Sequence, residues 1–129
     1  MKKYIMLFVA MIMIMGLTGC EKEDISYTQI SMKEAVAMME KENDYIILDV
    51  RTAKEFVEKH IPNAINIPNE TIGSEELTEL PDKNQLILVY CRSGNRSKQA
   101  AEKLVALGYT KIYEFGGIIA WTGETVSGE

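Results

Sequence analysis

The sequence CRSGNRS, residues 91–97, lies between an apolar run at residues 86–90 and a helical pattern at residues 98–107. This order predicts a buried strand, a tight loop and a helix. Open α/β folds bind their ligands at the carboxyl edge of the sheet, where such a loop would lie. The free N–H groups and the positive dipole end of the helix attract anions. The stretch therefore predicts an anion-binding loop at the carboxyl edge of a parallel sheet.

Cys91 is the first residue of this loop, and Arg92 and Arg96 place two positive charges near it. Those charges and the helix dipole are expected to favour the thiolate, the nucleophilic form of cysteine. Gly94 and Asn95 tolerate positive φ, so the chain can curl into a nest of inward-pointing N–H groups. A lone cysteine after a buried strand is usually a small apolar residue, but this setting favours a reactive thiol in an anion cradle.

The rest of the chain alternates between strand and helix patterns. Residues 45–50 form a continuous apolar run, as in a parallel strand that is buried on both faces. Ser31 and Thr52 each begin a capping-box pattern, with a glutamate three residues later. The alternation predicts an α/β fold with helices on both faces of the sheet. The other expected elements are strands at 27–30, 64–67, 86–90 and 111–115, helices at 31–42, 52–58 and 98–107, and a solvated acidic helix within 69–80.

Two further stretches accompany the loop in a fixed order. LDVRT at 48–52 leads through EF at 55–56 to HIPNAINIP at 60–68, and GGIIAW follows the loop at 116–121. Together the three stretches resemble the single-domain rhodaneses, a family of thiosulfate or persulfide sulfurtransferases, from about residue 26 to the last residue. The resemblance implies a rhodanese-like fold with a central parallel sheet of about five strands. Lys59 departs from the family, which commonly has glycine before His-Ile-Pro.

The expected reaction is a ping-pong sulfur transfer. The Cys91 thiolate would attack the outer sulfur of thiosulfate or another small anionic sulfane donor and form a persulfide. A thiol acceptor, either a small molecule or a protein, would then collect the sulfur. No cofactor is expected, and the substrate-binding residues would be Arg92, Ser93, Gly94, Asn95, Arg96 and Ser97. The hydroxyl of Ser97 has two equally good interpretations, a donor to the sulfur or a helix cap.

Asp49, Arg51 and His60 are expected to support the site. Asp49 and Arg51 allow a catalytic interpretation as an acid and an anion clamp, but buried charges must be paired, so a structural role is favoured. His60 is the only histidine. Thiolate attack on a sulfane sulfur needs no strong base, so His60 is better interpreted as a hydrogen-bonding residue that fixes a loop. One histidine and one free cysteine do not form a recognisable metal site.

The glycine pair Gly116-Gly117 allows two interpretations. It forms either a plain tight turn or a point where the backbone approaches the loop at 91–97. Trp121 is expected to anchor the end of the chain.

Two other functions share some of these features. Cysteine phosphatases and arsenate reductases use a similar cradle, but their pattern has five residues between the cysteine and an arginine. Here Ser97 occupies that arginine's position and Arg96 comes one residue early, so the spacing favours sulfur transfer. The third candidate is a membrane-tethered thiol redox or docking module. A redox relay usually has a resolving cysteine, which this chain lacks if Cys20 is acylated.

The N-terminus has the pattern of a secretory signal. Lys2 and Lys3 precede an apolar run at 5–17, and LTGC at 17–20 resembles the lipobox of bacterial lipoproteins. The expected division is a signal peptide at 1–19, a lipidated Cys20 with a tether at 20–26, and the rhodanese-like domain at 27–129. The alternative is an uncleaved membrane anchor. Either way the domain is expected outside the cytoplasmic membrane, and in the first case it is held there by lipid.

Composition limits the remaining possibilities. A chain of 129 residues with 47% hydrophobic and 26% charged residues fits one globular domain beside the N-terminal segment. The net charge of −5 gives no indication of a nucleic-acid partner. The chain has two cysteines, so lipidation of Cys20 would leave Cys91 without a disulfide partner.

Overall fold

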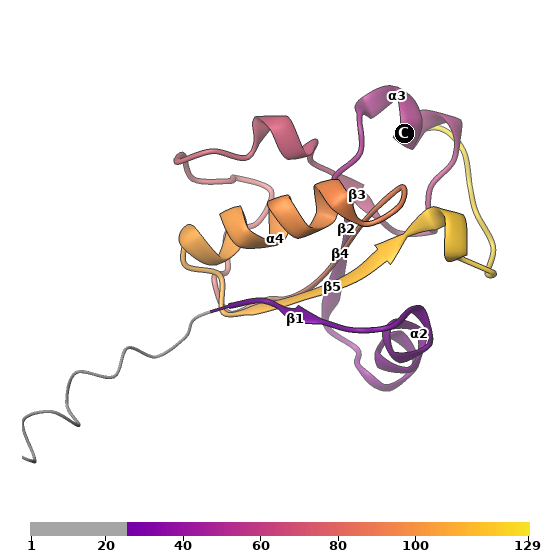
Figure 1. Ribbon diagram of the computed structural model, residues 1–129, viewed down its shortest axis with the longest axis horizontal. Helices are drawn as coiled ribbons and strands as arrows, with labels where there is room; N and C mark the ends of the chain where they lie inside the picture. Colours follow the sequence, from indigo (N-terminus) through magenta and orange to yellow (C-terminus); the bar gives the residue numbers. More distant parts are fainter. Residues whose placement is uncertain (1–25) are drawn as a thin grey trace, which may run out of the picture.

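Five parallel strands form one sheet in the computed structural model, which describes residues 26–129 (Figure 1). The strand order is β1-β5-β4-β2-β3. This confirms the predicted α/β fold with a parallel sheet of about five strands. In chain order the elements are β1 (Thr28–Gln29), α2 (Met32–Lys41), β2 (Tyr45–Asp49), α3 (Ala53–Glu58), β3 (Ile65–Asn66), η1 (Asn69–Thr71), β4 (Leu86–Cys91), α4 (Asn95–Ala106), β5 (Lys111–Gly117) and η2 (Ile118–Ala120).

Strand β4 lies at the centre of the sheet between β2 and β5. Its residues 87–91 are all buried, as the continuous apolar run predicted. Leu88 pairs with Ile47 of β2 and with Tyr113 of β5. Because all three strands are parallel, their carboxyl ends meet at one edge, and the segment after β4 begins at the middle of that edge.

Helices cover both faces of the sheet. Figure 1 shows α4 and α2 on opposite sides of it. Ala100 and Leu104 of α4 belong to one core cluster, and Ala35 of α2 and Phe56 of α3 belong to the other. Both faces of the central strands are therefore removed from water, which stabilises the fold chiefly by apolar burial. None of the helices among residues 26–129 is long and apolar enough to cross a membrane.

Both predicted capping boxes are present. Ser31 Oγ accepts a hydrogen bond from the Glu34 N–H, and the Glu34 carboxylate accepts one from the Ser31 N–H. Thr52 and Glu55 repeat the arrangement at α3. Each box satisfies two backbone donors that the start of a helix leaves unpaired, so these local signals set where both helices begin.

Two local predictions are wrong. The helix after the loop begins at Asn95, not at residue 98, so Asn95 is helical and only Gly94 takes a positive φ, of 115°. The acidic segment 69–80 forms only the short turn η1 and is otherwise irregular. Its buried apolar residues, Ile72 and Leu80, do not continue a helical stripe, although its glutamates are exposed as expected.

A buried polar network joins the end of β2 to β4. The Asp49 carboxylate is fully buried and accepts hydrogen bonds from the Arg51 guanidinium, at 2.6 Å from Nη2, and from the Tyr90 hydroxyl at 2.7 Å. The Tyr90 oxygen accepts one from the Ile61 N–H at 3.1 Å. Burial, followed by the hydrogen bond to Asp49, raises the pKa of Tyr90, so the hydroxyl stays protonated and donates. Arg51 also donates to the Lys59 carbonyl.

Replacing Tyr90 by phenylalanine should lower the free energy of unfolding by about 1–3 kcal/mol, because it leaves a buried carboxylate and the Ile61 N–H short of a partner. Urea denaturation of wild type and variant measures the difference. Tyr45→Phe on neighbouring β2 is the matched control, because the Tyr45 hydroxyl makes no hydrogen bond to another described residue; its effect should stay within about 0.5 kcal/mol. Equal losses in the two variants would contradict the role of the network.

Candidate active site

Cys91 is the last residue of β4 and is 1% exposed, so the strand ends one residue later than predicted and the loop begins at Arg92. Its Sγ accepts a hydrogen bond from the Gly94 N–H at 2.9 Å and lies 3.3 Å from Ser97 Oγ. The thiol is free. The sulfur thus faces a backbone donor at the start of α4, where the unpaired N–H groups and the helix dipole favour a negative charge. A reactive-cysteine role for Cys91 is therefore consistent with its surroundings.

The backbone of β5 approaches the loop very closely. A Cβ atom on Gly117 would lie 1.8 Å from the Arg92 carbonyl oxygen, so only glycine fits there. Gly117 pairs with Cys91 across an irregularity in the β4–β5 ladder, and Gly116 takes a φ of 92°. Of the two interpretations of the glycine pair, the structure therefore supports a close backbone approach.

The two loop arginines have different surroundings. Arg96 forms a two-pronged ion pair with Glu55 of α3, with N–O distances of 2.6 and 3.1 Å. The hydrogen bond from Arg96 lowers the pKa of Glu55 to about 2. Arg96, predicted as a substrate-binding residue, therefore has its guanidinium already paired with a carboxylate. Arg92 is exposed.

The hydroxyl of Ser97 lies at the centre of the buried side of the site. Its Oγ donates to the Gly94 carbonyl at 2.9 Å and lies 3.3 Å from Cys91 Sγ. The N-cap of α4 is Gly94, without a side-chain cap hydrogen bond, so Ser97 is not a helix cap, and its contact with the sulfur is the interpretation that stays open. The side chains of Ser93 and Asn95 are exposed, at the outer side of the loop.

Glu114 of β5 was not predicted as a site residue. It is fully buried, and its Oε2 lies 2.5 Å from Ser97 Oγ and 2.8 Å from the Gly116 nitrogen. The available signal was a glutamate within an otherwise apolar run next to the Gly-Gly pair. Such a residue in a central parallel strand has to be buried, because both faces of the strand are covered.

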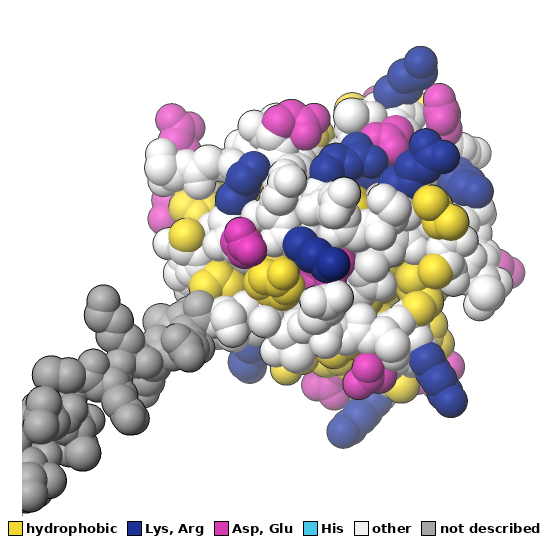
Figure 2. All heavy atoms as spheres, viewed as in Figure 1, with side chains coloured by type: hydrophobic (Ala, Val, Ile, Leu, Met, Phe, Trp, Pro, Cys, Tyr) yellow, Lys and Arg dark blue, Asp and Glu magenta, His cyan; other side chains and the backbone are white. Residues whose placement is uncertain are grey.

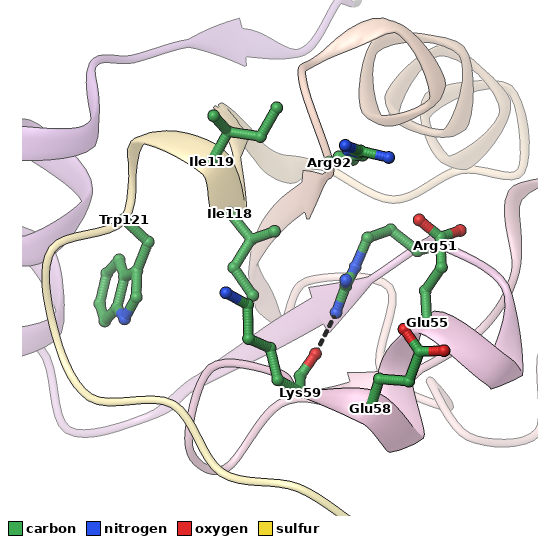
Figure 3. Close-up of a pocket in the computed structure, with 8 residues that line it drawn as sticks. All are labelled: Arg51, Glu55, Glu58, Lys59, Arg92, Ile118, Ile119 and Trp121. Atoms are coloured by element: carbon green, nitrogen blue, oxygen red, sulfur yellow. Dashed lines mark hydrogen bonds between the residues drawn. The ribbon is translucent and has the colours of Figure 1, made fainter.

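A pocket of about 570 Å³ opens beside the loop (Figure 3). In Figure 3, Arg51 and Glu55 lie on one side, Ile118 and Trp121 on the other, and Arg92 at the end nearest the loop. Figure 2 shows Lys and Arg side chains gathered between α3 and the N-terminal end of α4. The lining residues are Arg51, Glu55, Glu58, Lys59, Arg92, Ile118, Ile119 and Trp121. The pocket thus combines cationic groups with an apolar wall.

The support residues lie around this pocket. Asp49 and Arg51 form the buried pair described above, and Arg51 also faces the pocket. His60 Nδ1 is 2.8 Å from the Phe56 carbonyl oxygen, and the ring stacks on Phe56. The His60 backbone pairs with Val126, which holds the C-terminal segment against the loop after α3. These contacts are those of a residue that fixes a loop.

Trp121, which was predicted to anchor the end of the chain, lies against the body of the domain. Trp121 Nε1 donates to the Glu124 carbonyl at 2.9 Å, and the ring packs against a core cluster.

Within the described residues no three His, Cys, Asp or Glu side chains are grouped to hold a metal ion. Cys20 and the predicted signal peptide lie outside the described residues.

Comparisons with known proteins agree with this geometry. The profile of a family described as "Rhodanese-like domain" matches residues 31–124. Thiosulfate sulfurtransferase PspE of Escherichia coli (strain K12) is 39% identical over 71 residues, which are 55% of this chain and 68% of PspE. Thiosulfate sulfurtransferase GlpE of Coxiella burnetii (strain RSA 331) is 36% identical over 96 residues, covering 74% of this chain and 87% of GlpE.

A solved structure described as rhodanese with anions from E. coli superposes with a TM-score of 0.60 at 36% identity. The match covers 65% of this chain and 99% of that one. The family profile spans well over half of the sequence, in agreement with the resemblance of the three stretches. The chain belongs to the rhodanese family.

Proposed function

We propose that this protein is a rhodanese-type sulfurtransferase that carries sulfane sulfur as a persulfide on Cys91. The observation that supports this most directly is the position of Cys91 Sγ, 2.9 Å from the Gly94 N–H at the start of α4. The relatives in E. coli and C. burnetii are named thiosulfate sulfurtransferases. A sulfur atom in this position gains from the N–H group and the helix dipole whenever it carries negative charge.

The first half-reaction uses thiosulfate or a similar donor. The Cys91 thiolate attacks the outer sulfur, a new S–S bond forms, and the old S–S bond breaks with its electron pair leaving on sulfite. The outer sulfur of the new persulfide then carries the negative charge. In the second half-reaction an acceptor thiolate attacks that outer sulfur, takes it as a persulfide, and releases the Cys91 thiolate. Oxidation states balance without any cofactor.

The charges around the loop suit an anionic donor. Arg92 is exposed and lines the pocket together with Arg51, so Arg92 is the loop arginine available to meet the anion. Arg96 is held by Glu55 and fixes the first turn of α4 against α3. The apolar wall of Ile118 and Trp121 offers the acceptor a surface beside these cations.

The alternatives fit less well. In the phosphatase and arsenate reductase pattern an arginine binds the oxyanion, whereas here the neighbouring Arg96 is paired with Glu55 and the matching position is the buried Ser97. A thiol redox relay usually has a second, resolving thiol, and residues 26–129 contain no cysteine besides Cys91. The experiments below distinguish both of these alternatives from sulfur transfer.

We also propose that the protein is a lipoprotein anchored outside the cytoplasmic membrane through Cys20. The support is the basic start, the apolar run and the LTGC sequence. Residues 20–26 would then be a short tether between the lipid and the domain.

Incubating the full chain with thiosulfate should add the mass of one sulfur, about 32 Da, in a form that thiols reverse. Cys91→Ser should abolish the adduct and sulfur transfer while leaving the far-ultraviolet circular dichroism unchanged. Cys20→Ala is the matched control, since it removes the other cysteine and should keep the adduct. Turnover in Cys91→Ser would overturn the mechanism. Hydrolysis of a phosphotyrosine analogue without any sulfur adduct would favour the phosphatase alternative, and neither reaction would favour a docking or redox module.

Replacing Cys20 by alanine should remove the lipid and move the protein from the membrane fraction to the soluble fraction. Intact mass and detergent-free fractionation measure the two effects. Unchanged membrane association of the variant would support an uncleaved anchor instead.

Glu55→Gln should lower the free energy of unfolding by about 1 kcal/mol at neutral pH, because it removes the charge that holds Arg96. The folded-state pKa of Glu55 is about 2, below its ordinary value of 4.5. The stabilisation is therefore fully present above the ordinary value and is lost as the pH falls through the folded one. Denaturation curves of variant and wild type should converge at the acid end. Glu58→Gln, an exposed change on the same helix, is the control, and a pH-independent difference would contradict the ion-pair explanation.

A further inference from the structure

Glu114 is a buried acid that the sulfur-transfer steps above do not use. It is 0% exposed, and its Oε1 has no hydrogen-bond partner among the described residues. Its other oxygen, Oε2, has two partners, the Ser97 hydroxyl and the Gly116 N–H. A buried carboxylate in this position costs free energy unless hydrogen bonds or an opposite charge compensate for its lost hydration, or unless a proton neutralises it.

The Ser97 hydroxyl bridges this acid and the nucleophile. Ser97 Oγ lies 2.5 Å from Glu114 Oε2 and 3.3 Å from Cys91 Sγ. The hydroxyl has one proton, for which the Gly94 carbonyl at 2.9 Å is a third acceptor, and it can direct that proton to only one neighbour at a time. When Cys91 is a thiol, its S–H donates to Ser97 and Ser97 donates to the Glu114 carboxylate. When Cys91 is a thiolate, a protonated Glu114 donates to Ser97 and Ser97 donates to the sulfur.

We propose that Glu114 takes up the proton of Cys91 through Ser97, so that the buried cluster holds one negative charge that moves between the carboxylate and the sulfur. The proton of Sγ moves to Ser97 Oγ while the Ser97 proton moves to Glu114 Oε2. No charge enters or leaves the cluster. The thiolate forms in this way at a sulfur that is only 1% exposed, without a proton acceptor from bulk water.

The groups around Cys91 favour movement of the negative charge from Glu114 to the sulfur. The Gly94 N–H and the start of α4 lie at Cys91, and the charge of Arg96 acts on it. Arg92 is exposed, and Glu55 is paired with Arg96. At the other end of the cluster, Tyr27 and Glu102 lie near Glu114, and neither of these side chains carries a positive charge. The Gly94 N–H and the start of α4 thus stabilise a negative charge on the sulfur.

This inference rests on the proposed role of Cys91 as a nucleophile, but its test needs no sulfur donor. The rate of Cys91 alkylation by iodoacetamide is measured against pH on the full chain, together with the ultraviolet absorbance of the thiolate. Wild type should titrate in two steps, as coupled groups do, with a reactive plateau at acidic to neutral pH between them. Glu114→Gln keeps acceptors for Ser97 and Gly116 but cannot take a proton. It should show a single step and lose at least about tenfold in rate on the plateau, which corresponds to one pKa unit.

Ser97→Ala interrupts the same proton transfer while Glu114 itself is retained. This variant should also lose the step at lower pH in the alkylation profile. Glu102→Gln, an exposed change on α4, is the control and should keep the wild-type profile. An unchanged profile in Glu114→Gln would show that Glu114 only holds the backbone, and a profile moved to lower pH would show that it merely repels the thiolate; either result overturns the proposal. A two-step profile without any sulfur adduct would instead overturn the sulfur-transfer function alone.

Discussion

The close approach of Gly117 to the Arg92 carbonyl is the constraint on which the site depends. The absence of a side chain at Gly117 lets β5 reach the loop that leaves β4. That approach brings Glu114 of β5 beside Ser97 of α4, and the turn at Gly94 brings its N–H to Cys91. A single missing Cβ atom thus allows three elements of the fold to meet around one sulfur atom.

Two buried carboxylates in this fold differ in their hydrogen-bond partners. The difference indicates a structural role for one and a role in proton transfer for the other. Asp49 is surrounded by donors from Arg51 and Tyr90, and these hydrogen bonds tie β2 to β4. Glu114 has fewer donors and one oxygen without any partner among the described residues. A fully satisfied buried polar network makes the fold rigid, whereas an unsatisfied buried oxygen calls for an explanation, such as a role in chemistry. The first therefore holds the site together, and the second is the candidate for proton movement.

The two arginines of the loop also differ in their partners. Their spacing alone suggests that both bind an anion. Pairing of Arg96 with Glu55 assigns it to the junction between α4 and α3, and leaves Arg92 facing the pocket. A cation already bound by a neighbouring carboxylate offers less attraction to a ligand, so the proposed anion site is asymmetric.

The sequence by itself determined the fold class, the strand that leads to Cys91 and both capping boxes, because these depend on apolar periodicity and on hydrogen bonds between residues three apart. It also determined the family, through the three stretches that resemble rhodaneses. It misplaced the start of α4 and predicted a helix in the acidic segment, where local preference was weak. Only the tertiary structure decided that Arg96 pairs with Glu55, that Glu114 meets Ser97 and that Gly117 touches the loop. Those contacts join segments far apart in the chain, and they exist because packing brings the carboxyl ends of the parallel strands to one edge.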